Sequence, residues 1–259
     1  MLLAIDAGNT NIVFAVHDGN EFVHIWRCQT ISGRTSDEYA SWLHQLFSQT
    51  TLQFSDITDA IISSVVPDAN MNLSNFCRKF FDCEALMITH HDVDLAIKLD
   101  KPSEIGADRL VNSVAVKNHY QFPAIVIDFG TATTFDVIDA DGAYIGGVIA
   151  PGINLSMVAL YEAAAKLPKI NVKKTQSVIG HDTVSAMQSG VYWGYVGMIE
   201  GTIKRIAEEM DVEPKIIATG GLAHLFSESI PSIEIIDDDL TLRGLYDIYQ
   251  CKQQSIMAA

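Results

Sequence analysis

The chain has 259 residues, 48% of them hydrophobic, which is enough for one large core or two smaller ones. Its net charge of -15, from 17 basic and 32 acidic side chains, argues against a nucleic-acid or anionic-membrane binder, because both need clustered lysine and arginine. No apolar run approaches the roughly 18 residues of a membrane span. We expect a cytoplasmic protein without a signal peptide, whose four scattered cysteines are reduced and buried (Cys28, Cys77, Cys83 and Cys251).

The first informative stretch is an apolar run, Leu2 to Ile5, that ends on Asp6 and continues as Ala-Gly-Asn-Thr-Asn. Short apolar runs bounded by turn residues predict buried strands. A carboxylate at a strand end can face a cation, while the following glycine and threonine let the backbone approach and hydrogen-bond phosphate oxygens. A strand over 12–16, a turn at Asp18-Gly19 and a returning strand over 21–27 complete a predicted hairpin.

The rest of the first half has the alternation of an α/β domain. Thr35 and Glu38 form a candidate capping box before an amphipathic helix that reaches Phe47. A strand over 60–66, a second amphipathic helix to about residue 81 and a strand over 84–88 follow.

The segment Lys101 to Arg109 is the second informative stretch. It precedes a predicted helix, so Asp108 and Arg109 fall in the first turn, where amide groups and the helix dipole favour an anion. The arginine could bind a carboxylate, and the aspartate could take a proton from a hydroxyl. Dipole compensation and a surface ion pair explain the same two residues, and the sequence leaves both interpretations open.

The strand and loop of the N-terminus recur in the second half. The run Ile125 to Asp128 is followed by Gly130 and three threonines, at 131, 133 and 134. Strands over 135–138 and 143–149 flank a turn at Asp141-Gly142. Because Asp128 follows Asp6 by 122 positions, we predict two similar α/β domains, residues 1–119 and 120–259, with a cleft between them and one phosphate loop from each.

Several glycines in the remainder of the second half mark expected turns or close contacts. Pro151-Gly152 could be a substrate-contacting rim or a tight turn, and Gly220-Gly221 could admit a flat adenine or simply make a turn. Thr183 lies near the start of a long predicted helix through Glu209. Its glycines at 190, 194, 197 and 201 indicate one face for close helix packing, within the chain by default or between copies. The acidic triplet at 237–239 is expected to solvate a turn.

Several familiar motifs are missing from the sequence. It contains no Gly-x-x-x-x-Gly-Lys-Ser/Thr P-loop, no Gly-x-Gly-x-x-Gly and no His-x-x-x-His. P-loop and Rossmann phosphate binding are therefore unsupported.

Five motifs taken together resemble the type III pantothenate kinases, of the acetate and sugar kinase/Hsc70/actin superfamily. They are Asp6-x-Gly-Asn-Thr, Gly-Ala-Asp-Arg at 106–109, Asp-Phe-Gly-Thr-Ala-Thr-Thr at 128–134, Gly146-Gly147 with Pro151-Gly152, and Thr219-Gly220-Gly221. The resemblance covers nearly the whole chain, and the second and third motifs narrow it to this family.

The resemblance implies two ribonuclease-H-like/actin-like α/β domains with a nucleotide cleft. It also implies a phosphotransferase with an alcohol acceptor, which moves the ATP γ-phosphate to pantothenate in the first step of coenzyme A biosynthesis. Asp108 resembles the general base, Asp128 the ligand of a monovalent cation (potassium or ammonium), and Asp6 a Mg²⁺ partner through phosphate. The implied ATP-binding residues are Asp6, Ala7, Gly8, Asn9, Thr10, Asn11, Ile12, Val13, Thr131, Gly220 and Gly221. The implied substrate-binding residues are Gly106, Ala107, Asp108, Arg109 and Thr183, the last reaching in from the other subunit of a homodimer.

One segment departs from the family pattern. Where the family usually has Tyr-Asp-Asn-Pro, with the tyrosine on pantothenate, this chain has Leu99, Asp100, Lys101 and Pro102. Two other functions are weighed: a superfamily kinase for another small alcohol or acid, and a non-enzymatic nucleotide-binding transcription accessory protein. The set of Asp6, Asp108 and Asp128 speaks against the second.

Overall fold

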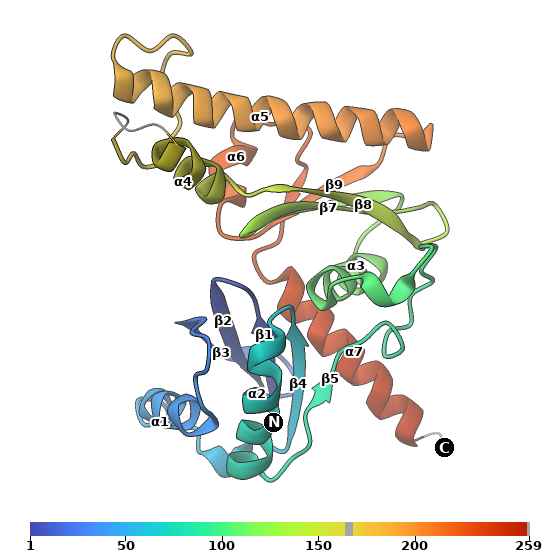
Figure 1. Ribbon diagram of the computed structural model, residues 1–259. Helices are drawn as coiled ribbons and strands as arrows, with labels where there is room; N and C mark the ends of the chain where they lie inside the picture. Colours follow the sequence, from blue (N-terminus) through green and yellow to red (C-terminus); the bar gives the residue numbers. More distant parts are fainter. Residues whose placement is uncertain (164–167, 258–259) are drawn as a thin grey trace. The chain divides into compact units, whose positions relative to one another are not determined.

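The computed structural model describes residues 1–163 and 168–257 and divides into two compact units (Figure 1). Unit 1 contains residues 1–94, 100–118 and 241–259, and unit 2 contains residues 95–99 and 119–240. Each unit has one five-stranded mixed sheet with helices, so the predicted α/β class is confirmed. No helix in the described ranges is long and apolar enough to cross a membrane.

The sheet of unit 1 has the order β3-β2-β1-β4-β5. Strand β1 is antiparallel to β2 and β2 to β3, whereas β4 and β5 join in parallel. The strands are β1 (Leu2–Ala7), β2 (Asn11–His17), β3 (Phe22–Gln29), β4 (Asp59–Ser64) and β5 (Leu86–Met87).

Helices pack on this sheet because each has an apolar stripe. Helices α1 (Ser36–Phe47) and α2 (Pro67–Phe81) bury Leu43 and Phe76 in a core with Phe14. Helices α3 (Ala107–His119) and α7 (Leu240–Met257) pack together, since a Cβ on Gly244 would collide with the Val111 carbonyl oxygen. Two short 3-10 helices, η1 (Phe54–Asp56) and η2 (Pro102–Glu104), complete the unit.

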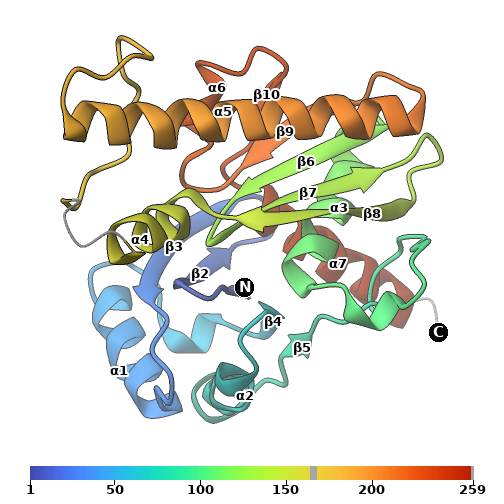
Figure 2. The same ribbon diagram turned by 45° about the horizontal axis from the view of Figure 1, so that its top comes forward.

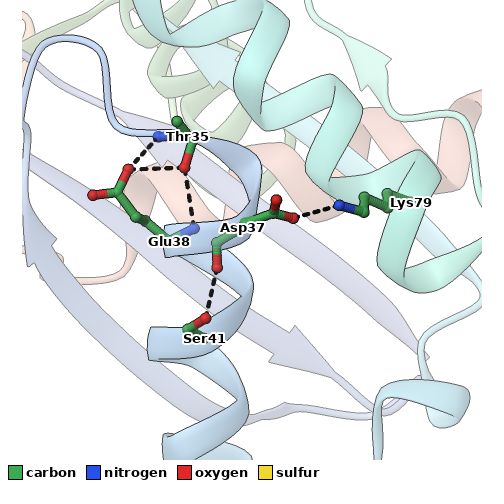
Figure 3. A network of polar contacts seen from close by, with 5 residues as sticks. All are labelled: Thr35, Asp37, Glu38, Ser41 and Lys79. Atoms are coloured by element: carbon green, nitrogen blue, oxygen red, sulfur yellow. Dashed lines mark hydrogen bonds and ion pairs between the residues drawn. The ribbon is translucent and has the colours of Figure 1, made fainter.

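The start of α1 confirms the predicted capping box (Figure 3). The Glu38 amide donates to Thr35 Oγ1 at 3.3 Å, and the Thr35 amide donates to Glu38 Oε2 at 2.8 Å. Asp37 pairs with Lys79 of α2 at 2.5 Å. Both of these side chains are exposed, so the pair adds at most about 1 kcal/mol.

The sheet of unit 2 has the order β10-β9-β6-β7-β8, and Figure 2 shows α5 running along it. Its strands are β6 (Ala124–Phe129), β7 (Ala132–Ile138), β8 (Tyr144–Pro151), β9 (Lys215–Thr219) and β10 (Ile235–Ile236). Its helices are α4 (Ile153–Ala163), α5 (Thr183–Met210) and α6 (Ala223–Ser227). Phe135 of β7, Tyr192 of α5 and Phe226 of α6 are fully buried in its core.

The two sheets have the same strand connectivity and the same register shift at the end of the second strand. Asp6 pairs with Val13 seven positions later, whereas Asp128 pairs with Thr134 six positions later, so the loop of unit 2 is one residue shorter. The next turn, after Ile138, is one residue longer than its counterpart. These two changes cancel, so residues after the turn are again separated from their counterparts by the same number of positions as Asp6 and Asp128.

The predicted boundary after residue 119 lies one residue from the observed one, and two further segments are exchanged. Helix α7 belongs to unit 1, and the segment Leu95–Leu99 belongs to unit 2. Helix α7 is tied to unit 1 by Tyr246, which stacks on His17 at 3.7 Å, and by Thr241, which donates to Asn112 at 2.8 Å. Amphipathic periodicity predicts that a helix packs but not against which sheet it packs.

Three smaller predictions are corrected. Asp237 is not a solvated turn residue: it is 7% exposed and accepts a hydrogen bond from Tyr120 Oη at 2.7 Å. Gly190, Gly194 and Gly197 do not serve packing within the described part of the chain, since a Cβ there would meet none of its atoms within 4 Å. Cys251 is exposed rather than buried, although all four thiols are free. The sequence also predicts a helix from about Asn154 to Lys166; α4 covers its beginning, and its predicted end lies outside the described residues.

Candidate active site

Asp6 lies at the carboxyl end of β1, between Val13 on β2 and Ser63 on β4. Its carboxylate is half-buried and the side chain of Ser63 is completely buried. Burial, and secondarily the nearby charge of Asp108, raise the pKa of Asp6 to about 6, although Ser63 and Arg27 pull it down. Such a carboxylate gains from a cation beside it, because the cation offsets the repulsion.

The loop after β1 is held in a compact form by hydrogen bonds. The Gly8 amide donates to the Asn11 carbonyl at 3.0 Å, and Thr30 holds the loop from outside. The Thr30 hydroxyl donates to the Gly8 carbonyl at 2.6 Å, and its amide donates to the Thr10 carbonyl at 2.9 Å. No local pattern points to Thr30, because its contacts are 20 or more positions away.

The side chains of this loop divide into two groups. Ala7 and Ile12 are fully buried in the core, so they could reach a ligand only through the backbone. Asn9, Thr10 and Asn11 are exposed and carry the polar groups of the loop.

Asp108 lies in the first turn of α3, as the sequence predicts. The Leu110 amide donates to the Gly106 carbonyl at 3.1 Å, which places Gly106 at the N-cap, followed by the buried Ala107. The Arg109 amide donates to Asp108 Oδ1 at 2.8 Å. Burial raises the pKa of Asp108, and the bond and charge of Arg109 partly oppose this rise. A raised pKa brings a carboxylate closer to the range of an effective general base.

Asp6 and Asp108 are brought together although 102 positions separate them in the chain. The strand end and the helix start therefore form one acidic site within unit 1, with Arg109 beside it.

The corresponding strand end of unit 2 carries Asp128, which pairs with Thr134 on β7 and Thr219 on β9. Gly220 has φ of +90°, and a Cβ there would lie 2.6 Å from Asp128 Oδ1. Only glycine fits this position, for reasons of both conformation and space. Gly152 is restricted by space, because a Cβ would lie 2.2 Å from the Thr131 carbonyl oxygen.

The three threonines of this loop have different environments. Thr131 is exposed, which suits a nucleotide contact. Thr133 is completely buried, and its hydroxyl bonds to the Tyr195 hydroxyl in the core. Thr134 donates to Asp136 Oδ2 at 3.3 Å. Thr133 is therefore a core residue, unlike the exposed Thr131.

The remaining predicted residues of unit 2 are accessible. Gly221 is exposed, and a Cβ there would meet no atom within 4 Å. Thr183 is the exposed first residue of α5, whose N-cap Asp182 accepts a hydrogen bond from the Ser185 amide at 2.9 Å.

The segment that departs from the family pattern makes local contacts. Lys101 is exposed and pairs with Glu104 of η2 at 2.9 Å, so its ammonium group has a partner three residues away. Leu99 lies against Gly146, at 3.7 Å from the position of a Cβ there.

The resemblance implies a Mg²⁺ ion and a monovalent cation, and the oxygen ligands of the site fit these two ions in different ways. Among the described residues, no group of three or more histidine, cysteine, aspartate or glutamate side chains could hold a metal alone. Asp6 fits Mg²⁺, which proteins often bind through one or two carboxylates together with substrate phosphates. Asp128, between two threonines, offers the hard oxygen environment that a monovalent cation needs.

Two units with one shared strand order, each carrying an Asp-x-Gly turn near the end of its central strand, define a two-unit α/β protein of the actin-like fold class. Solved structures agree on the fold. A Campylobacter jejuni protein described as a conserved putative Baf family transcriptional activator is 19% identical with a TM-score of 0.63, covering 97% of this chain and 99% of that one. A putative N-acetylmannosamine kinase from Listeria monocytogenes is 14% identical with a TM-score of 0.57, covering 97% and 99%.

Sequence comparison then identifies the family. The model of the type III pantothenate kinase family matches residues 2–205. The type III pantothenate kinase of Paramagnetospirillum magneticum is 56% identical over 96% of this chain and 97% of its own length. That of Phenylobacterium zucineum is 53% identical over 98% and 99%. The chain belongs to the type III pantothenate kinase family.

Proposed function

We propose that Asp108 is the general base for phosphoryl transfer from ATP to the primary hydroxyl of pantothenate. The reaction is that of the family: ATP-dependent phosphorylation of pantothenate to 4′-phosphopantothenate, the first step of coenzyme A biosynthesis. The observation that carries the assignment is the adjacency of Asp108 and Asp6 in unit 1, with a raised pKa at both carboxyls.

The steps follow from the chemistry of phosphoryl transfer. Asp108 accepts the hydroxyl proton as the pantothenate oxygen forms a bond to the γ-phosphorus. The bond from that phosphorus to the bridging oxygen breaks, and ADP leaves with the electron pair. Little covalent help is needed, so positioning and charge neutralisation dominate. Arg109 binds the pantothenate carboxylate, because a guanidinium matches a carboxylate in a two-bond fork.

Two ions supply positive charge. Asp6 would hold Mg²⁺ through the ATP phosphates, and Asp128 would hold potassium or ammonium. The protein needs such charge, because Asp6 and Asp108 repel a polyphosphate from the same site. Thr131, Gly220 and Gly221 would contact the nucleotide, and Gly106 to Arg109 the substrate.

A homodimer completes the proposal. Thr183 would contact substrate bound by the partner subunit, and the open glycine face of α5 (Gly190, Gly194 and Gly197) supports helix packing between copies. Gly194→Leu would then shift the sedimentation profile from dimer towards monomer, while a wild-type monomer at micromolar concentration would contradict the dimer. Cytoplasmic location and the absence of nucleic-acid binding remain predictions, which cell fractionation and a gel-shift titration test.

The decisive assay couples ADP release to NADH oxidation, with pantothenate as acceptor. We expect turnover with the wild type and a loss of about 10²-fold or more in kcat for Asp108→Asn, the range of general acid–base groups. Near-normal turnover of folded Asp108→Asn would remove it from the mechanism. A panel of other small alcohols and acids separates the related-kinase alternative. ATP binding without consumption on any of them would favour the transcription accessory alternative.

A further inference from the structure

We propose that Arg27 is a phosphate-binding residue of this site and that its guanidinium contacts the γ-phosphoryl group of ATP. The inference rests on the proposed placement of the ATP phosphates at Asp6. It assigns a role to a residue that none of the sequence motifs contains.

Sheet register places Arg27 on the same face as Asp6. Arg27 of β3 pairs with Val13 of β2, and Val13 pairs with Asp6 of β1. Residues paired laterally across strands point to the same side of a sheet. With strands about 4.8 Å apart, the Cα atoms of Arg27 and Asp6 are separated by about 10 Å. Only the apolar Val13 stands between them in this row, so no third charge separates the basic side chain from the acidic one.

Neighbouring strand residues confirm the direction of the Arg27 side chain. The residues before and after it, Trp26 and Cys28, pack into the core formed with α1 and α2. Because side chains alternate along a strand, Arg27 points to the opposite face, which is also the face of Asp6. It is exposed there, whereas Trp26 and Cys28 are not.

The charge of Arg27 has no direct protein partner. Within residues 1–163 and 168–257, Arg27 makes no ion pair, hydrogen bond or ring contact, whereas every other lysine and arginine of unit 1 makes at least one. Its positive charge nevertheless lowers the pKa of Asp6. An unpartnered guanidinium near a carboxylate that it does not bind indicates a space for an anion or an anion–metal complex between them.

A phosphoryl group fits this space better than other anions. Arg109 lies beside the candidate base, and we assign it to the pantothenate carboxylate. Arg27 lies in the same strand row as Asp6, so it is the cationic side chain that we assign to the phosphate. The guanidinium offers several N–H donors in a rigid plane, suited to phosphate oxygens. Arginine and lysine clamps stabilise charge on a transferring phosphoryl group, and loss of one preorganised donor to a developing negative charge costs on the order of 10²–10³-fold in kcat.

The test compares Arg27→Gln and Arg27→Lys with the wild type, with Arg78→Gln as matched control. Arg78 is an exposed arginine of the same unit whose partner is Glu84. Steady-state kinetics give kcat and both KM values, and calorimetry gives affinities for Mg-ADP and for a non-hydrolysable Mg-ATP analogue.

We expect Arg27→Gln to lower kcat by about 10²-fold with little change in the KM for pantothenate. It should weaken binding of the ATP analogue at least tenfold while ADP binding changes less than twofold. Arg27→Lys should recover part of both losses, and Arg78→Gln should match the wild type. The binding measurements with the ATP analogue and ADP need no pantothenate. They therefore test the contact between Arg27 and the γ-phosphoryl group even if the acceptor is a different alcohol.

Three results would overturn the proposal. The first is a kcat of Arg27→Gln within twofold of wild type. The second is an equal loss of affinity for ADP and for the ATP analogue. The third is a change in the pH dependence of kcat that leaves its plateau value unchanged. The last would mean that Arg27 acts only by adjusting the charge of Asp6. If Arg27→Gln does not fold, as judged by circular dichroism, the same criteria apply to Arg27→Lys, which keeps the charge but loses the planar fork.

Discussion

A Cβ atom on Gly106 would lie 2.5 Å from Oδ1 of Asp108, so the N-cap glycine of α3 makes room for the candidate base. No real side chain tolerates that separation, and the carboxylate would have to rotate away. Gly106→Ala should therefore displace Asp108 without removing it.

We expect Gly106→Ala to lower kcat by at least about tenfold while the protein remains folded, because small misplacements of a catalytic group are costly. The coupled assay gives kcat, and thermal melting monitors the fold. Unchanged kcat in the alanine variant would show that the Asp108 carboxylate has an equally productive second position.

Asp6 should reduce the stability of the ligand-free protein at neutral pH. Its pKa is about 6 in the folded state against an ordinary value of 3.8, so the folded state binds the proton more tightly than the unfolded state. Stability is therefore lost as pH rises from about 4 to 6 and stays reduced above that range. Asp6→Asn should be more stable than wild type at pH 8, by roughly 1–3 kcal/mol, and the gain should shrink towards pH 4.

Urea unfolding at the two pH values, without Mg²⁺ or nucleotide, measures this effect. Asp18→Asn is the matched control of opposite sign, since hydrogen bonds from the Glu21 and Asn20 amides lower the pKa of Asp18. A gain for Asp6→Asn that is the same at pH 4 and pH 8 would contradict the electrostatic explanation.

Gly220 is restricted by conformation and by space, and the two contributions can be separated. Its φ is +90°, and a Cβ would lie 2.6 Å from Asp128 Oδ1 and 2.8 Å from the Phe129 nitrogen. Gly19 has a comparable φ of +109° but no atom within 4 Å of such a Cβ. We expect Gly19→Ala to cost about 1–2 kcal/mol from backbone strain alone, and Gly220→Ala to cost clearly more. Urea unfolding of both variants gives the comparison, and equal costs would rule out the steric contribution.

Asp128 should determine the response to monovalent cations. Asp128→Asn removes the negative charge that would hold the ion, so the rate should no longer depend on potassium. The measurement is the phosphorylation rate over a potassium titration, with choline chloride keeping the ionic strength constant. A titration curve identical to that of the wild type would exclude this carboxylate as the cation ligand.

Local patterns predicted the local elements well. The capping box at Thr35 and Glu38 was correct because all of its atoms lie within one helical turn. The strands leading to Asp6 and Asp128 were predicted to within two residues, because each begins as a short apolar run, but both continue past the carboxylate, to Ala7 and Phe129. Predictions that depended on distant contacts were less successful. Thr133 looks like a loop hydroxyl in the sequence, yet strand β7 begins at Ala132 and turns Thr133 into the core towards Tyr195.

The α/β class, the repeated carboxylate turn and the family follow from the sequence, because these depend on residue order within short segments. Which of those residues act together follows from the folded chain instead. Folding brings Asp108 close enough to raise the pKa of Asp6, places α7 on the first sheet and aligns Arg27 with Asp6 across two strands. Charge interactions and steric exclusion depend on distance in space, and strand register and helix packing fix that distance.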